Sequence, residues 1–232
     1  MSITKAVLYE NTGDAPKDRI TSINKLYNYL KENAVPDYFD SVELKEEYPN
    51  FDYKVLCKKG NRTILTFFAN GNYSKYYVIS DLSPTYSFSY GSKTNCIDHV
   101  YKCNNGFLFV MADSSNASGD KGSISITKDN EGNLTLIIAD SLMVKQNATS
   151  KICVINEHTD VSAYNTVYYD CSDSAMSNYQ TVIAPLPVCG SSIGYFYTPN
   201  AYIMPFSQIS QPGKIDINGS KYITNGLWCI KD

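Results

Sequence analysis

Few residues of this chain have both the type and the spacing for metal binding. Cys96, His99 and Cys103 stand at positions i, i+3 and i+7, so on a helix they would share one face. Thiolate and imidazole are zinc ligands, but a structural zinc site needs four ligands in tight pairs, and no fourth candidate lies nearby in the sequence. On a strand, the three side chains would be divided between two faces. We therefore expect two buried thiols and a polar surface histidine here rather than a metal site.

The second histidine and one serine motif are the remaining candidates for catalysis. His158 follows Glu157, but its polar neighbours predict a solvated turn rather than the environment that shifts the pKa of a general base. Residues 190–194 read G-S-S-I-G and match the G-x-S-x-G motif, in which Ser192 would be the nucleophile. That motif needs a helix after the serine and a histidine later in the chain. Here a strand-like run follows and both histidines come earlier, so we expect a glycine-flanked bend that enters a strand.

Loop acids give the only other candidate ligands. One group is Asp113, Asn116 and Asp120, and another is Asp170 and Asp173. Neither group has the D-x-D-x-D-G spacing with a trailing glutamate that a calcium loop needs, although an adventitious ion is the alternative. The sequence also lacks a phosphate-binding loop and a dinucleotide fingerprint. We therefore predict no catalytic residue, no bound metal and no cofactor.

Aromatic side chains are the abundant contact-making groups. The chain has 20 tyrosines and one tryptophan but only 2 histidines. Tyrosine buries a ring, keeps a polar hydroxyl and suits strands and contact surfaces. Three uses remain open for these rings, namely packing between strands, an interface with another subunit, and a platform for stacking sugars. Tyr202, Tyr222 and Trp228 are our aromatic candidates for binding a partner in the C-terminal region.

One amphipathic helix is predicted over residues 16–33. Pro16 opens it and Pro36 ends it. Its apolar residues fall at helical spacing; they are Ile20, Ile23, Leu26, Tyr27 and Leu30. This stripe either packs on the chain's own sheet or docks onto a neighbouring subunit, and we include all five residues among the candidate partner-binding residues. Residues 41–48 are expected to form a short helix or an extended arm.

After about residue 50, short runs rich in Ile, Val, Thr, Tyr and Phe alternate with turn residues. Asn218-Gly219 is a turn of the type that joins two antiparallel strands. Other hairpin turns are predicted at residues 58–62, 69–72 and 129–132. The predicted strands are residues 62–68, 73–80, 106–112, 123–128, 133–139, 151–156, 166–170, 181–184, 193–197, 214–218, 222–224 and 227–230.

The predicted fold class follows from this pattern. Closely spaced strands without intervening helices favour an antiparallel sandwich or barrel. We expect a mainly β fold, an antiparallel β-sandwich or barrel with an N-terminal helical arm. The arm would comprise residues 1–50 and the β body residues 51–232.

Composition excludes several classes of protein. The net charge is −3 and no stripe of Lys and Arg appears, which argues against sequence-specific nucleic-acid binding. The chain contains no run of the ~20 apolar residues that a membrane span requires. The first residues show no secretory signal, so we expect reduced cysteines in a chain made in the cytoplasm.

The C-terminal region resembles a known class of proteins. From Ile215 to Asp232 the chain reads I-x-I-N-G-x-x-Y-I-x-N-G-x-W-x-I-x-D, and residues 184–205 add proline- and tyrosine-rich runs. This ending is similar to virion structural proteins of tailed bacteriophages. The resemblance implies a protein without catalytic residues that assembles in the host cytoplasm, becomes part of the virion, and contacts copies of itself and other virion proteins.

The sequence thus predicts a non-enzymatic structural component of the head, neck or tail of a tailed-phage virion, acting through subunit contacts. The alternative is a glycan- or receptor-binding β module whose partner is a glycan on the host surface. An enzyme is the third class considered.

Overall fold

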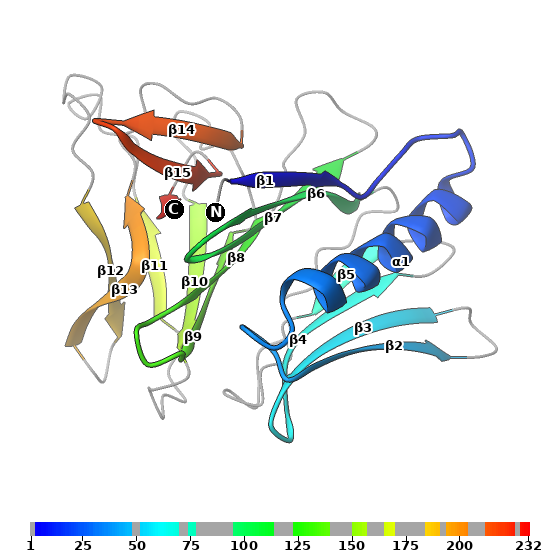
Figure 1. Cartoon of the computed structure of the whole chain (residues 1–232), viewed down its shortest axis with the longest axis horizontal. Coiled ribbons are helices and arrows are strands. Elements are labelled where there is room, and N and C mark those ends of the chain that lie inside the picture. The colour runs from blue at the N-terminus through cyan, green and yellow to red at the C-terminus, as the bar shows by residue number, and fades with distance from the viewer. Residues whose placement is uncertain are drawn as a thin grey trace.

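The computed structural model describes residues 3–47, 52–69, 74–77, 95–113, 123–139, 150–156, 165–169, 184–190, 194–203, 212–225 and 228–232. They form one helix and strands arranged in three antiparallel sheets (Figure 1). The elements are β1 (Thr4–Val7), α1 (Ala15–Asn33), β2 (Ser41–Glu47), β3 (Asp52–Lys59), β4 (Arg62–Ala69), β5 (Ser74–Tyr77), β6 (Asn95–Cys103), β7 (Gly106–Asp113), β8 (Ser123–Lys128), β9 (Leu134–Ala139), β10 (Ser150–Asn156), β11 (Asn165–Tyr169), β12 (Ala184–Gly190), β13 (Gly194–Ile203), β14 (Gly213–Ile217), β15 (Ser220–Thr224) and β16 (Trp228–Lys231).

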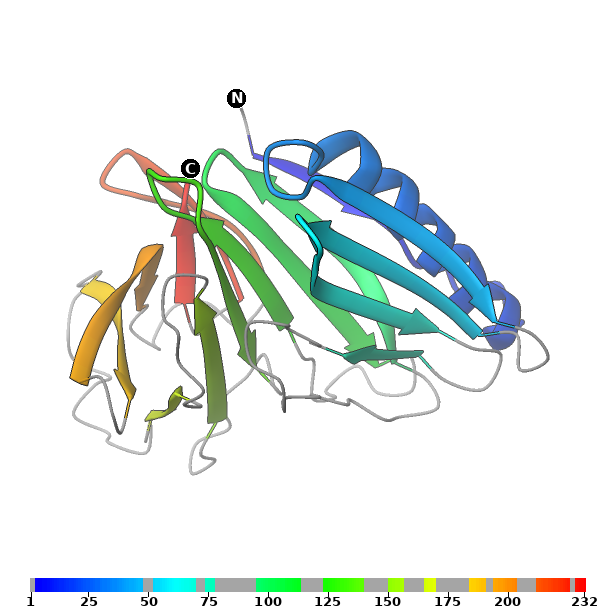
Figure 2. The same ribbon diagram turned by 90° about the horizontal axis from the view of Figure 1, so that it is seen from below.

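The largest sheet lies at the centre of the molecule. Its strand order is β1-β6-β7-β8-β9-β10-β11. A four-stranded sheet, β2-β3-β4-β5, lies on one side of it together with α1, and a five-stranded sheet, β12-β13-β16-β15-β14, lies on the other (Figures 1 and 2). We call the five-stranded sheet the C-terminal sheet. The mainly β, antiparallel fold class predicted from the sequence is therefore confirmed.

The helix begins where its first residues can be capped. The Asp14 side chain accepts a hydrogen bond from the backbone N–H of Lys17 at 3.3 Å, and a proline follows in the first turn. Asp18 accepts two further bonds from Thr12, one from the backbone N–H at 2.9 Å and one from the hydroxyl at 2.6 Å. The hydroxyl bond lowers the pKa of Asp18 below its usual value because it favours the carboxylate. These bonds hold the loop before α1 against the helix.

One face of the central sheet packs against α1 and the four-stranded sheet. Phe107 and Phe109 of β7 and Ile124 and Ile126 of β8 point to this side and are fully buried. They share a core with Leu26 and Leu30 of α1 and with apolar residues of β3 and β4. The apolar stripe of the helix is therefore used inside the protein.

The opposite face of the central sheet is also covered. Leu108 and Val110 alternate with the two phenylalanines of β7 and point to the other side. There they pack with Ile223 of β15 and Ile230 of β16. The central sheet is thus sandwiched between two layers, and β7 and β8 bury both of their faces.

The segment predicted as a helical arm, residues 1–50, contains α1 and also contributes two strands to the sheets. Residues 4–7 form β1, which pairs with β6 of the central sheet. Residues 41–47 form β2, which pairs with β3 from Ser41↔Lys58 to Glu47↔Asp52. The strands on either side of the predicted boundary are therefore paired with each other, and α1 shares a core with β3 and β4.

The strand predicted at residues 181–184 overlaps the described residues only at Ala184. The strand found there, β12, runs from Ala184 to Gly190 and contains Pro185 and Pro187. Proline lacks the N–H that a central strand needs, which is why the sequence pattern missed this segment. The structure accommodates both prolines because β12 is an outer strand of the C-terminal sheet and its pairing with β13 shifts register between them.

Candidate interaction surface

Cys96, His99 and Cys103 all lie on β6, so the helical arrangement considered for a zinc site does not occur. His99 is 9% exposed, so the expectation of a surface histidine is wrong. Its Nδ1 lies 2.7 Å from a carboxylate oxygen of Asp98, while the buried Nε2 has no hydrogen-bond partner among the described residues. The Cys103 thiol donates weakly to the carbonyl of Gly106 at 3.5 Å. Across the described part of the chain, no three His, Cys, Asp or Glu side chains gather closely enough to hold a metal ion.

Three buried cysteines are poor nucleophiles. Cys57, Cys103 and Cys229 are buried free thiols. Burial raises the pKa of Cys103 and of Cys229 to about 12, and it raises the pKa of Cys57 as well, because the thiolate loses its hydration. The reactive form of cysteine is the thiolate, so these side chains stay protonated and unreactive at neutral pH.

Several other candidates for chemistry lie outside the described residues. They are Ser192, His158, Asn116, Asp120, Asp170 and Asp173. The elements around Ser192 are nevertheless defined, because β12 ends at Gly190 and the paired strand β13 begins at Gly194. A strand follows this serine, as the sequence predicts, and not the helix of a hydrolase elbow.

The helix residues named as partner-binding candidates are mostly used inside the protein. Ile23, Leu26 and Leu30 are 5%, 0% and 0% exposed and belong to the core shared with the sheets. For these three, packing on the chain's own sheets is the alternative that the structure supports. Ile20 and Tyr27 are half-buried, so part of each side chain stays available at the surface.

Trp228 is also a core residue. It is 1% exposed, and its indole N–H donates to the hydroxyl of Ser125 on β8 at 2.9 Å. Asn225 makes a second link of this kind, donating from its side-chain amide to the hydroxyl of Ser123 at 2.8 Å. The tryptophan therefore anchors the C-terminal sheet on the central sheet instead of reaching a partner.

The C-terminal sheet also has a face that points away from the central sheet. Ile223 and Ile230 are paired across β15 and β16 and point inward, so their neighbours along each strand point outward. Residues that face each other on paired strands lie on the same side of a sheet. The pairs Tyr202↔Cys229 and Ile215↔Tyr222 therefore place Tyr202 of β13 and Ile215 of β14 on this outer side as well. The outer face, as we call it, consists of Tyr202, Ile215, Ile217, Tyr222 and Cys229.

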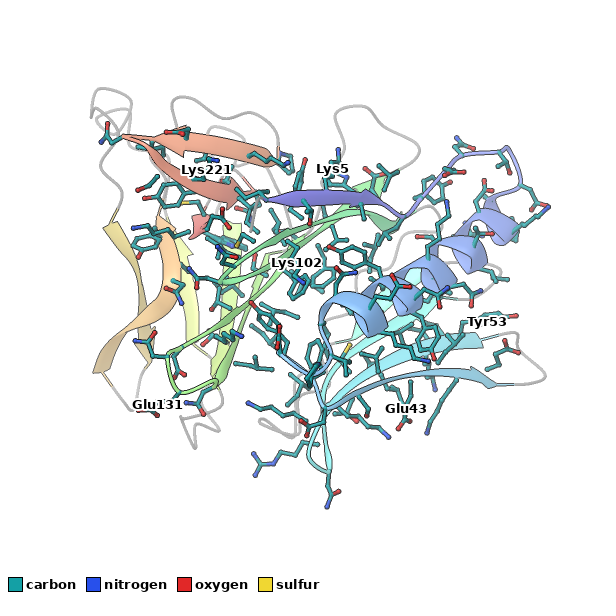
Figure 3. The ribbon with its side chains drawn as sticks, in the orientation of Figure 1. Lys5, Glu43, Tyr53, Lys102, Glu131 and Lys221 are labelled. Atoms are coloured by element: carbon teal, nitrogen blue, oxygen red, sulfur yellow. The ribbon has the colours of Figure 1, made fainter. Side chains whose placement is uncertain are left out.

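The outer face combines buried and accessible apolar groups. Tyr222 is 7% and Cys229 0% exposed, while Tyr202, Ile215 and Ile217 are half-buried. The rings of Tyr202 and Tyr222 meet edge to face with centroids 6.1 Å apart, which fixes both orientations. The exposed Lys221 lies on the same hairpin (Figure 3). This arrangement is a rigid apolar patch with a polar margin, the anatomy of a protein contact surface.

The sequence identified the two tyrosines of this face but not its two isoleucines. Ile215 and Ile217 alternate with Lys214 and Asp216 in β14, which is the pattern of a strand with one apolar and one polar side. That alternation could have identified the two isoleucines as accessible members of the outer face, because β14 is one of the two outer strands of its sheet.

Comparison with known proteins gives no further guidance, since no protein-family model, curated protein or solved structure matches this chain. None of the described helical residues forms a segment long and apolar enough to cross a membrane.

Proposed function

We propose that this chain is a non-enzymatic structural component of a tailed-phage virion and that it acts through contacts between subunits. The observation that carries the proposal is the C-terminal ending that resembles such proteins. Its residues form the β14–β15–β16 part of the C-terminal sheet and contribute most of the outer face. The same segment thus carries both the resemblance and the accessible apolar patch.

Physical chemistry explains how such a face would work in an assembly. Ile215, Ile217 and the ring of Tyr202 are held on a sheet, so little conformational entropy is lost when a partner covers them. Covering apolar surface contributes roughly 25 cal/mol per Å² of buried area. A single contact through these few residues is weak, and it becomes strong when many copies bind together. The partners in this proposal are other virion proteins and further copies of the chain.

The proposal is tested on virions purified by density gradient from cells that express the chain during phage growth. We expect quantitative mass spectrometry to find the chain in the particles at a fixed copy number. The double variant Ile215→Glu with Ile217→Glu should fold but be lost from the particles, because each carboxylate would have to be desolvated at the contact.

Lys17→Glu is the matched control. It changes the net charge by the same amount as the double variant, at an exposed position in the first turn of α1. A negative charge is tolerated there because it interacts favourably with the positive end of the helix dipole at the N-terminus of α1. If the control is incorporated into the particles and the double variant is not, the outer face is supported as the contact surface. Purified particles that lack the wild-type chain altogether would overturn the proposal.

The second candidate is a glycan-binding module, favoured by the fixed ring pair of Tyr202 and Tyr222. In that case the purified chain alone would bind a glycan array, and Tyr202→Ala would remove the binding. Virion incorporation without glycan binding would exclude this candidate.

A further inference from the structure

Strand β1 forms an outer edge of the central sheet. It pairs with β6 on one side, from Thr4↔Lys102 to Val7↔His99, and no described strand pairs with its other side. Figure 1 shows β1 lying along the border of the sheet beside β6. The outward row of backbone N–H and C=O groups can therefore accept another strand.

The hydrogen bonds around β1 show which residues point their backbone groups outward. The backbone N–H of Leu8 donates to the carbonyl of Asp98 on β6 at 2.8 Å, so residues 4, 6 and 8 face β6. Residues 3, 5 and 7 then face outward. The carbonyl of Ile3 agrees with this assignment, because it accepts a bond from Lys214 Nζ of β14 at 2.7 Å rather than from β6.

The side chains of β1 leave this edge accessible. Thr4 and Lys5 are exposed, and Val7 is the only large hydrophobic residue that the described part of the chain exposes widely, at 55%. Lys5 is the single charge on the strand, and its ammonium lies 5.5 Å from the centroid of the Tyr101 ring. The outer strand β2 of the four-stranded sheet differs, because its sequence S-V-E-L-K-E-E contains four charged residues. Such charges disfavour pairing with a further strand.

We propose that β1 is a dimerisation strand, which pairs antiparallel with β1 of a second copy of this chain and joins two central sheets across a two-fold axis. Facing residues in an antiparallel pair alternate between hydrogen-bonded and non-hydrogen-bonded positions. Two residues that face each other across the two copies must therefore both point their backbone groups toward the partner strand or both point them away from it. The axis must therefore pass through a residue facing its own copy. A register centred on Thr4 would pair Lys5 with Ile3, whose carbonyl already accepts a bond from Lys214, so registers centred on Lys5, Ala6 or Val7 are left.

Charge and hydrogen bonding select the register centred on Ala6. Centring on Lys5 places two ammonium groups directly opposite each other, which is destabilising. Centring on Val7 places Lys5 opposite Tyr9, whose N–H already donates to the carbonyl of Asp98 at 3.1 Å. Centring on Ala6 places Lys5 opposite Val7 twice. Each of those pairs exchanges two backbone hydrogen bonds, and the lysine stem covers the exposed valine.

Disulfide cross-linking of single cysteine variants tests which residues of the two β1 strands face each other. In the proposed dimer the two copies of Ala6 face each other at a non-hydrogen-bonded position, where Cα atoms lie about 4.5 Å apart and a disulfide can form. Ala6→Cys should therefore form a covalent dimer on mild oxidation. Thr4→Cys is the matched control on the same face of the strand, because its two copies would be about four residues apart, roughly 13 Å.

Lys5→Cys and Val7→Cys complete the series, and the wild-type chain with its own cysteines gives the background. Efficient linking only at position 6 supports the proposal. Preferential linking at position 5 or 7 would overturn the register, and linking at none of the three positions above background would overturn the pairing itself.

Sedimentation velocity over a range of concentrations gives an independent test. Val7→Pro removes an outward N–H without removing a bond to β6, because proline is tolerated at the solvent side of an edge strand. It should raise the dimer dissociation constant by about tenfold or more. Val7→Thr keeps the N–H and the shape of the side chain, so it should dimerise nearly as the wild type does.

The tryptophan fluorescence of Trp228 confirms that each variant is folded. A wild-type chain that stays monomeric at every concentration would overturn the proposal and leave the edge to a strand of another protein. The inference does not depend on the proposed virion role, because a dimer formed through β1 would stand even if the chain were absent from phage particles.

Discussion

A row of buried hydroxyls on β8 determines how the C-terminal sheet sits on the central sheet. Ser123, Ser125 and Thr127 alternate with apolar residues that point to the opposite core. The first two accept bonds from Asn225 and Trp228, whereas the hydroxyl of Thr127 is buried without a hydrogen-bond partner among the described residues. The hydroxyl of Ser125 therefore stabilises the fold through a hydrogen bond, whereas burial of the Thr127 hydroxyl is unfavourable.

At this scale we predict opposite effects for two conservative substitutions. Ser125→Ala should destabilise the protein by roughly 1–3 kcal/mol, because the indole N–H of Trp228 would stay buried without an acceptor. Thr127→Val should be neutral or stabilising by up to about 1 kcal/mol, because it removes a buried hydroxyl that has no bond to lose. Urea unfolding followed by fluorescence of the single tryptophan measures both values.

Thr127→Val serves as the control for Ser125→Ala, since both residues lie on the same strand and face. Equal losses of stability in the two variants would contradict the hydrogen-bond argument, because Thr127→Val removes no hydrogen bond.

At the scale of elements, the β14–β15 hairpin depends on its turn. Asn218 and Gly219 have φ values of 52° and 78°, the left-handed conformations of a two-residue hairpin turn. The Asp216 side chain adds a bond by accepting from the N–H of Gly219 at 3.0 Å. The turn was predicted from the Asn-Gly pair alone and is confirmed.

We predict that Gly219→Val destabilises the hairpin by about 1–3 kcal/mol, because a β-branched residue is strained at positive φ. Gly213→Ala in the same hairpin is the control. A Cβ atom at either position would meet open space, but Gly213 is outside the left-handed region, so its substitution should cost far less. Thermal unfolding compares the two variants, and an equal loss in both would refute the conformational explanation.

Local patterns identified several elements correctly and failed on others for physical reasons. The helix at residues 16–33 and the hairpins around residues 69–72 and 129–132 are confirmed, because periodicity and turn residues act between sequence neighbours. The sequence leaves residues 41–48 open between a short helix and an extended arm, and the structure shows that residues 41–47 form strand β2. Its charged residues carry no strand signal, and only pairing with β3 decides its conformation.

At the scale of the whole molecule, the layers bury thiols that belong to different sheets. Cys57 lies on β3, Cys103 on β6 and Cys229 on β16. Desolvation raises the pKa of each thiol, so the folded protein holds protons that the unfolded chain releases above about pH 8.5. The contribution of these groups to stability is therefore complete below that pH and decreases as the pH rises toward 12.

We predict that the free energy of unfolding declines progressively above about pH 8.5. Cys229→Ser should make the decline smaller, because its hydroxyl does not titrate in that range. Peptide mapping after brief alkylation at pH 8 should show no label at these three cysteines in the folded protein and full label after unfolding. Labelling of Cys57 in the native state would contradict the burial described for β3.

The sequence by itself determined the mainly β class, the helix at residues 16–33, the hairpin turns and the scarcity of catalytic groups, because each depends on residue type and short-range spacing. Tertiary structure decided which faces are buried. The central sheet is covered on both sides, so Ile23, Leu26 and Leu30 of the helix and Trp228 became core, while Val7 and the isoleucines of β14 stayed accessible. Contacts such as β1 with β6 join residues about ninety positions apart, and no local pattern encodes which distant partner will cover a given face.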